Sequence, residues 1–364
     1  MNPRSIYFIV NPISGTNDKE QIIKLIPTFI NKENFDYQIH YTQYAGHAEE
    51  IAREASHNNI DIVVAIGGDG TVNEVARALV QTNTALGIIP CGSGNGLARH
   101  LEIPMDAAGA LKVINTCLIK ELDYGVINNH PFFCTCGIGF DAFVSSKFAE
   151  AGKRGFLTYL DNTLKEGLKY KPETYHIVLD DDKSMEYEAF LIACANASQY
   201  GNNAYIAPQA SMSDGLLDVT IMEPFSILEA PQIAIQLFNK RITENSKIKS
   251  FRCKKIHISR KSPGVIHYDG DPIEASNEID VEIKAKGLKV IVNEGGGKYA
   301  MPLVQMFADF YTEIAQIKED WTQIKDDIWQ FRDEVRDKRK QLLKKNKEII
   351  RKIKSGDIKN NKTD

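Results

Sequence analysis

Residues 65–79, AIGGDGTVNEVARAL, join an apolar segment to an amphipathic one through a glycine-rich corner. Gly67, Gly68 and Gly70 remove most Cβ atoms from this corner, so we expect its main-chain N–H groups to be accessible to an external group. Phosphate is the usual ligand of a corner beside a helix start, because helix N-termini attract anions. The stretch therefore predicts a strand, a phosphate-binding turn and a helix in succession.

Thr71 and Glu74 continue this pattern, because T-x-x-E is the signature of a capping box at a helix N-terminus. Asp69 conflicts with it, since a carboxylate inside an anion site repels phosphate. A Mg²⁺ ion resolves the conflict, because Mg²⁺ favours a carboxylate together with nucleotide phosphates as ligands. The corner contains neither G-x-x-x-x-G-K-[ST] nor G-x-G-x-x-G, so a P-loop and a dinucleotide fingerprint do not explain it.

The sequence around this corner alternates short apolar segments with amphipathic ones. The predicted strands are 5–10, 37–42, 61–66 and 85–90, with helices near 18–31 and at 47–58. This alternation is typical of a parallel sheet covered on both faces. Beyond about residue 124, short strands dominate, with helices expected near 141–168 and 226–240. We therefore expect an α/β protein with a nucleotide-binding domain at 1–124, a β-rich substrate domain at 125–296 and a helical tail at 297–364.

Composition limits the class of protein. The 364 residues are 43% hydrophobic, which is enough for large cores in two domains. Lys and Arg total 44 against 48 for Asp and Glu, so the net charge of −4 gives no reason to expect a nucleic-acid partner. The six cysteines lack C-x-x-C spacing and the first residues lack a signal-peptide pattern, which favours the cytoplasm. No segment has the length and apolarity of a membrane span, so any membrane contact is expected to be peripheral.

Two further strand ends carry small residues rich in hydrogen-bond donors. Asn11 and Ser14 follow the first predicted strand. Gly92, Ser93 and Asn95 follow the strand that ends at residue 90. Together with the GGDG corner, three strands of one parallel sheet thus end in such loops, and the carboxyl ends of parallel strands lie at one edge. The three loops together predict a nucleoside triphosphate site.

The tail has a different pattern. Apolar residues from Leu303 to Val335 alternate spacings of four and three, which is typical of a heptad helix with a partner face. Residues 336–354 then hold ten Lys or Arg against two acidic residues. Three interpretations fit this segment: a solvated helix end, a homodimeric coiled coil, or a basic amphipathic helix on anionic lipid.

Six motifs follow one another along the chain: NPISG (11–15), GGDGTVNEV (67–75), GIIPCGSGNGLAR (87–99), GIGFDA (137–142), NASQYGNNAYIAPQASMSDGLLDV (196–219) and YDGDP (268–272). Together they resemble the diacylglycerol kinase catalytic-domain family, which includes bacterial lipid kinases and the sphingosine and ceramide kinases. The resemblance covers roughly residues 5–295 and excludes the tail. It implies an N-terminal domain of the phosphofructokinase type, a C-terminal β-sandwich, ATP as phosphate donor, and phosphorylation of a lipid hydroxyl at a membrane surface.

The resemblance also implies which residues bind ligands. With the loop residues above, the predicted ATP-binding set is Asn11, Thr42, Gly67, Gly68, Asp69, Gly70, Thr71, Val72, Asn73, Gly92, Ser93, Asn95 and Arg154. Asp141 matches a position that faces the substrate head group in sphingosine kinases, and a helix N-cap is the alternative. The implied ligands of a structural Mg²⁺ are the Asp214 carboxylate and the main-chain carbonyls of Ser211 and Leu216, and an Asp-Gly turn is the alternative. The GSGNG loop is similar to the sphingosine kinase version, which favours a sphingoid base while diacylglycerol stays open.

Phosphoryl transfer to an alcohol needs a group that accepts the hydroxyl proton. Asp269 and Asp271 are the candidates, because a regular strand through VIHYDGD places both on one face. Two carboxylates that close raise the pKa of one of them, which suits a general base. The family pattern is D-G-E, with the second acid as proton acceptor; Asp271 is one methylene shorter, so Asp269 stays a co-candidate. The alternative is that D-G-D-P forms a hairpin turn.

Two other functions fit part of the pattern. An NAD kinase or a phosphofructokinase shares the GGDGT loop but has a water-soluble acceptor, and the YDGDP and SMSDGLLDV motifs favour the lipid kinases instead. A catalytically silent, coiled-coil membrane scaffold is the second, and the intact carboxylates at positions 69, 214, 269 and 271 argue against it.

Overall fold

The computed structural model describes only part of the chain. Residues 1–297 form one compact unit. The described residues are 3–14, 19–143, 145, 170–226 and 229–293. The predicted heptad and basic tail and Arg154 lie outside them.

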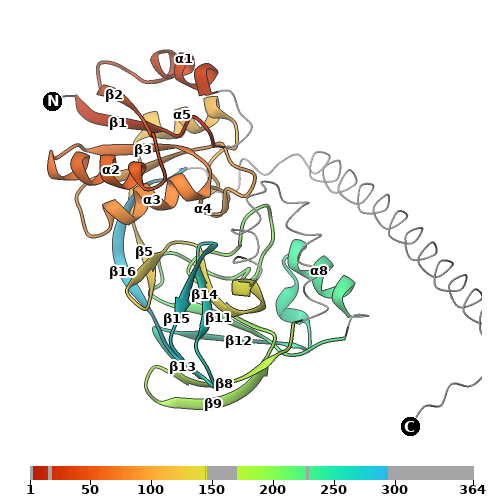
Figure 1. Ribbon diagram of the computed structural model, residues 1–364. Coiled ribbons are helices and arrows are strands. Elements are labelled where there is room, and N and C mark those ends of the chain that lie inside the picture. Colours follow the sequence, from red (N-terminus) through yellow and green to blue (C-terminus); the bar gives the residue numbers. More distant parts are fainter. Residues whose placement is uncertain (1–2, 15–18, 144, 146–169, 227–228, 294–364) are drawn as a thin grey trace, which may run out of the picture. The chain divides into compact units, whose positions relative to one another are not determined.

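The first part of the chain contains a parallel sheet (Figure 1). Its strands are β1 (Arg4–Val10), β2 (Phe35–Tyr41), β3 (Ile62–Gly67) and β4 (Ala85–Pro90). They are parallel and lie in the order β2-β1-β3-β4. Every residue of β3 and β4 is buried, as expected of central strands covered on both faces. The predicted parallel sheet is therefore confirmed.

Helices cover both faces of this sheet. They are α1 (Lys19–Phe29), α2 (His47–His57), α3 (Asp69–Leu79), α4 (Gly96–His100) and α5 (Ala107–Thr116). α1 packs against α5 on one side of the sheet, and α2 packs against α3 on the other (Figure 1). Val72, Val75 and Leu79 form the buried stripe of α3, which packs on β3 and β4. This packing fixes the start of α3 at the carboxyl edge of the sheet.

The rest of the described chain is rich in antiparallel strands. β16 (Glu278–Ile291) pairs in parallel with β4 at Val290 and Leu86 and so extends the first sheet. The strands that it brings into that sheet are β5 (Ile119–Ile127), β6 (His130–Phe132), β8 (Glu173–Leu179), β9 (Lys183–Ala189) and β13 (Lys255–Arg260). All pairings beyond β16 are antiparallel, which makes the sheet mixed.

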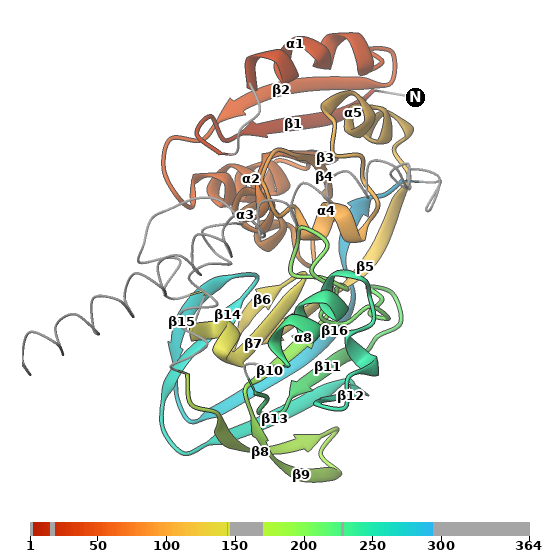
Figure 2. The ribbon, with the colours of Figure 1, turned by 90° about the vertical axis from the view of Figure 1, so that its right-hand side faces the viewer.

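A second sheet is antiparallel throughout. It contains β7 (Thr135–Gly139), β10 (Leu191–Ala195), β11 (Leu217–Met222), β12 (Ile248–Cys253), β14 (Gly264–Tyr268) and β15 (Asp271–Ala275), in the order β12-β11-β10-β7-β14-β15. Its residues Ile138 and Ile192 share one buried cluster with Ile177 and Ile258 of the first sheet. The other face of the second sheet packs against α8 (Ala230–Phe238) through Ile233 (Figure 2), and a short 3-10 helix (Ile242–Glu244) follows.

The expected succession of an α/β part and a β-rich part is confirmed. The phosphofructokinase type of the first part and the domain limits at 124 and 296 stay predictions. One strand prediction was wrong: VIHYDGD does not continue as one strand, because β14 ends at Tyr268.

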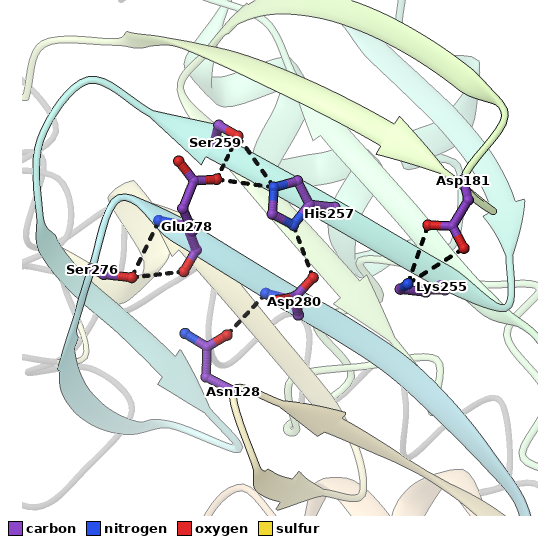
Figure 3. Close-up of polar contacts among 8 residues, drawn as sticks. All are labelled: Asn128, Asp181, Lys255, His257, Ser259, Ser276, Glu278 and Asp280. Carbon is purple, nitrogen blue, oxygen red and sulfur yellow. Dashed lines mark hydrogen bonds and ion pairs between the residues drawn. The ribbon is translucent and has the colours of Figure 1, made fainter.

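The outer face of the first sheet carries a histidine–carboxylate cluster (Figure 3). His257 on β13 lies between two acidic residues of β16, with Nδ1 2.8 Å from Asp280 and Nε2 2.9 Å from Glu278. The Ser259 hydroxyl also donates to Glu278, at 2.7 Å. Hydrogen bonding to Asp280 raises the pKa of His257. The cluster joins two neighbouring strands across a solvent-facing surface.

Candidate nucleotide and phosphoryl-transfer site

The three predicted loops converge at the carboxyl edge of the parallel sheet. The Asn11 N–H donates to the Ile66 carbonyl at 3.1 Å, and the Cys91 N–H donates to the Gly67 carbonyl at 2.8 Å. Thr42 follows β2 and is buried, with its N–H 2.9 Å from the Val10 carbonyl. The ends of β1, β2, β3 and β4 are thus joined by main-chain hydrogen bonds, as the parallel arrangement predicted.

The capping box predicted at Thr71 and Glu74 is absent. The N-cap of α3 is Gly68, and no side chain caps it. Thr71 lies inside the first turn, where its hydroxyl accepts a hydrogen bond from the Asn11 side chain at 3.0 Å. Glu74 reaches α2 instead, and accepts from the Gly46 and Ala48 N–H groups at 2.9 and 3.2 Å. The prediction failed because partners distant in sequence compete for both side chains.

Close packing explains most of the glycines. A Cβ on Gly67 would lie 2.5 Å from the Thr71 side chain, and a Cβ on Gly92 would lie 2.8 Å from the Gly68 main chain. Only Gly70 among the three corner glycines has open space where a Cβ would be. The expectation that all three glycines open the main chain to a ligand is therefore corrected: Gly67 makes room for the Thr71 side chain, Gly68 lies against Gly92 of the next loop, and Gly70 leaves room beside the helix N-terminus.

Asp69 turns away from that space. Its carboxylate accepts the Asn95 N–H at 2.8 Å and the Gly96 N–H at 2.7 Å. Burial raises the pKa of Asp69, and these N–H donors and the charge of Arg99 oppose that rise. Main-chain N–H donors therefore already compensate the charge of Asp69, so the expected repulsion of phosphate by this carboxylate does not by itself require a Mg²⁺ ion.

The loop after β4 closes on itself. The Asn95 side chain accepts from the Gly92 N–H at 2.9 Å and donates to the Gly92 carbonyl at 2.6 Å. Asn95 has a φ of 50° and is the N-cap residue of α4, while Ser93 between these two residues is exposed. Val72 and Asn73 are buried within α3. Of these predicted ATP contacts, the Ser93 hydroxyl is the side chain most accessible to a ligand.

The acidic motif near residue 270 forms a hairpin turn. Tyr268 pairs with Asp271 across the hairpin, and Asp269 and Gly270 between them have φ values of 49° and 88°. Positive φ at both central residues is the pattern of type I′ hairpin turns. The expectation that residues 269 and 271 lie on one face of a regular strand is therefore wrong, and the Asp-Gly turn signal decides the local structure.

Asp269 points into the protein. Its carboxylate accepts the N–H groups of Phe133, Cys134 and Thr135 at 2.8, 2.7 and 3.1 Å. Burial raises the pKa of Asp269 to about 6, although these donors and the charge of Arg77 favour the ionised form. Asp269 therefore fixes the hairpin to the segment before β7.

Asp271 is exposed and engages the α/β part. Its side chain is 51% exposed, and its carboxylate lies 3.2 Å from Nη1 of Arg77 on α3. The Arg77 guanidinium also lies 3.7 Å from the Glu49 carboxylate and over the Tyr268 ring. Sequence reasoning missed Arg77, because it lies on the helix stripe beside buried positions and no motif marks it.

Asp141 lies in a buried polar group. Its carboxylate is 3.0 Å from Nε2 of His267 and accepts from the Tyr200 hydroxyl at 3.3 Å. It also accepts the N–H of Ala142 at 2.8 Å, in the helical turn that begins after β7. Asp141 and His267 are 8% and 2% exposed. His267 and Tyr200 were also missed by sequence reasoning. The position of His267, two residues before Asp269, is the signal that could have placed it near the hairpin.

The loop predicted to hold a metal is already bonded. Asp214 forms an ion pair with Arg252 and accepts the Leu216 N–H at 3.1 Å. One carboxylate oxygen of Asp218 is buried without a hydrogen-bond partner among the described residues. No group of three His, Cys, Asp or Glu side chains in the described part of the chain has metal-binding geometry. The predicted set with the Ser211 and Leu216 carbonyls uses main-chain oxygens and stays a prediction.

The fold and these loops define an α/β protein in which a glycine-rich corner of the parallel sheet and an acidic hairpin are linked through α3. The sequence profile of the diacylglycerol kinase catalytic domain matches residues 5–127, and that of the YegS C-terminal NAD kinase beta sandwich-like domain matches residues 134–292. The chain belongs to the diacylglycerol kinase catalytic-domain family, and the resemblance seen in the motifs is confirmed.

Relatives support this assignment. A protein of Streptococcus pneumoniae serotype 4, provisionally named a lipid kinase, is 30% identical over 295 residues, which cover 78% of this chain and 96% of the relative. A diacylglycerol kinase of Staphylococcus aureus is 28% identical over 274 residues, which cover 72% and 84% of the two chains. The crystal structure of a diacylglycerol kinase from Bacillus anthracis str. Sterne has the same fold, with a TM-score of 0.62 and 23% identity over 80% of this chain and 97% of its own.

Proposed function

We propose that the chain transfers the γ-phosphate of ATP to a hydroxyl group of a membrane lipid. The observation that carries this proposal is the exposed Asp271 carboxylate, which a hairpin of the β-rich part presents to α3. The N-terminus of α3 forms the phosphate-binding corner. Arg77 in the last turn of α3 thus connects the proposed proton acceptor to the helix whose first turn forms the proposed phosphate corner.

ATP is proposed to bind at the joined loops. The open space beside Gly70 at the N-terminus of α3 favours the phosphates, because helix N-termini attract anions. Asn11, Thr42 and Ser93 border the same edge of the sheet, and Arg154 remains a proposed contact outside the described residues. The other predicted contacts support the loops, because Asp69 and Asn95 bond to main-chain groups.

Asp271 is the better candidate for the proton acceptor. During transfer, the lipid hydroxyl oxygen forms a bond to the γ-phosphorus, the bond to the β-phosphate oxygen breaks, and the hydroxyl proton passes to the Asp271 carboxylate. Asp269 is partly buried and its carboxylate accepts three main-chain N–H groups, so it holds the hairpin rather than the proton. Arg77 holds the Asp271 carboxylate in place between turnovers.

Mg²⁺ bound with the phosphates would neutralise their charge and align them. The Asp69 carboxylate already accepts one main-chain N–H at each oxygen, so it would offer such an ion only its remaining lone pairs. A second, structural Mg²⁺ is proposed at Ser211, Asp214 and Leu216, and the nearby buried oxygen of Asp218 that has no partner among the described residues supports it. Such an ion would compete with Arg252 for the Asp214 carboxylate.

Asp141 is proposed to face the polar head group of the lipid. Its buried position beside His267 and Tyr200 supports a polar pocket that hydrogen-bonds to a hydroxyl or amine of the head group. A sphingoid base and diacylglycerol both offer a hydroxyl, and GSGNG favours the sphingoid base. A water-soluble acceptor such as NAD and a silent membrane scaffold are the competing functions.

Contact with the membrane is proposed to be peripheral and cytoplasmic. No helix among the described residues is both long and apolar enough to cross a bilayer. The ten Lys and Arg of residues 336–354 provide an attraction to anionic lipid, and the heptad segment before them is a proposed homodimer contact.

The test is transfer of labelled γ-phosphate to lipids in mixed micelles. Sphingosine, dihydrosphingosine, diacylglycerol and ceramide are compared, with NAD as the soluble acceptor and EDTA as the metal-free control. Labelled lipid that depends on Mg²⁺ is expected. Labelled NAD alone indicates a soluble-acceptor kinase, and no label in any acceptor indicates the scaffold.

A further inference from the structure

A buried histidine, His267, connects the Asp141 carboxylate to the hairpin turn at Gly270. His267 lies on β14 directly opposite Gly137 of β7. Its Nε2 atom lies 3.0 Å from an Asp141 carboxylate oxygen, and both side chains are almost fully buried. Buried polar groups are expensive unless they are paired, so this contact is a fixed part of the structure.

Gly137 makes this contact sterically possible. A Cβ at that position would lie 2.3 Å from the Asp141 carboxylate and 2.9 Å from Nε2 of His267. Any side chain at residue 137 would therefore separate the two groups. The sequence provides glycine at the one strand position where the histidine and the carboxylate must meet.

The other ring nitrogen of His267 contacts the hairpin. The Gly270 N–H donates to Nδ1 at a long 3.4 Å. A nitrogen that accepts carries no proton, so in the neutral ring the proton is on Nε2 and is donated to Asp141. Gly270 directly precedes Asp271, and its positive φ sets the direction in which the chain enters β15.

We propose that His267 is a positioning residue that couples the head-group carboxylate Asp141 to the turn that presents Asp271. This inference rests on the proposed lipid kinase function. His267 holds Asp141 with one nitrogen and the Gly270 N–H with the other. It thereby fixes the distance between the place where the lipid head group binds and the carboxylate that accepts its proton.

Two substitutions separate the two contacts. In His267→Asn, the amide oxygen replaces Nδ1 as acceptor for Gly270 but the side chain no longer reaches Asp141. In His267→Gln, the amide nitrogen replaces Nε2 as donor to Asp141 and the contact with Gly270 is lost. We expect the Asn variant to raise KM for the lipid with kcat nearly kept. We expect the Gln variant to lower kcat by about 10-fold to 100-fold, because small misplacements of a reacting group cost that much.

The matched controls are His257→Asn and His257→Gln in the exposed cluster of Figure 3, which are expected to leave kcat and KM unchanged. A merely structural role of His267 lowers thermal stability in both variants and changes kcat and KM alike. Parallel changes in the two variants would therefore overturn the proposal, while the split between KM and kcat supports it.

A second measurement does not depend on turnover. The ¹⁵N chemical shifts of the His267 ring, assigned by comparison with His267→Gln, report which nitrogen carries the proton. A neutral ring protonated at Nε2 supports the coupling, and a proton on Nδ1 contradicts it. Failure of every lipid to accept phosphate would instead overturn the proposed function, so the two failures are distinguishable.

Discussion

The GGDG corner and the YDGD hairpin contain the same pair of residues with different outcomes. In both, the Asp before Gly points into the protein and accepts main-chain N–H groups: Asp69 from Asn95 and Gly96, and Asp269 from residues 133–135. The corner has no further acid, because α3 follows Asp69 directly. The hairpin has a second acid, Asp271, which its turn leaves exposed. An Asp-Gly pair in a loop thus indicates a structural carboxylate as readily as a catalytic one.

The largest effect on stability is expected for Asp69→Ala. The substitution leaves the Asn95 and Gly96 N–H groups without an acceptor in a buried loop, so we expect a loss of about 3 kcal/mol in the free energy of unfolding. Urea denaturation followed by circular dichroism measures it. Asp271→Ala is the control and should cost less than about 1 kcal/mol, because its ion pair is exposed. Equal losses of unfolding free energy in Asp69→Ala and Asp271→Ala would contradict the structural role given to Asp69 alone.

Asp269 is expected to give stability a distinct pH dependence. Its folded pKa of about 6 lies above the ordinary value, so the native state binds the proton more tightly than the unfolded state. Stability is therefore lost as pH rises from about 4 to 6, by on the order of 2 kcal/mol. Urea denaturation of Asp269→Asn at pH 4.5, 5.5 and 6.5 should lack this slope. The same slope in wild type and variant would show that Asp269 is ionised throughout.

Arg77→Met tests the ion pair that holds Asp271 from α3. Loss of the 3.2 Å contact frees the Asp271 carboxylate, so we expect kcat for lipid phosphorylation to fall about tenfold, equivalent to about 1.4 kcal/mol. Steady-state kinetics with saturating ATP measure the change. Arg53→Met, which removes an exposed partner of Glu49 on α2, is the matched control. An unchanged kcat in Arg77→Met would show that the arginine does not position the base.

The smallest effect is expected at the outer face of the first sheet. The raised folded pKa of His257 means that its ion pairs stabilise the protein fully below the unfolded pKa of about 6.5 and that this stability is lost as pH rises through the folded value. For partly exposed groups the contribution is about 0.5 kcal/mol. His257→Gln should therefore be less stable than wild type at pH 6 and equal to it at pH 9. A constant difference at both pH values would contradict this assignment.

Local sequence patterns predicted the features that depend on residues close together in the chain. The buried strand β3, the corner and the stripe of α3 follow from apolar periodicity, and the Asp-Gly pair gave a turn signal that was considered as the alternative at residue 269. Partners far along the chain were beyond such reasoning. Glu74 bonds to residues 26 and 28 positions away, and Arg77 meets Asp271 across 194 positions. The direction of each carboxylate was therefore not predictable from a single sequence.

A single-turnover comparison of wild type with Asp271→Asn tests directly whether Asp271 accepts the hydroxyl proton. Bound ATP and labelled lipid are measured in the same mixed-micelle sample, with thermal unfolding as a check of the fold. We expect equal ATP binding, an unchanged fold and transfer slowed by about 10² to 10⁴-fold in the variant. Transfer at the wild-type rate by Asp271→Asn would contradict the assignment of Asp271 as the proton acceptor.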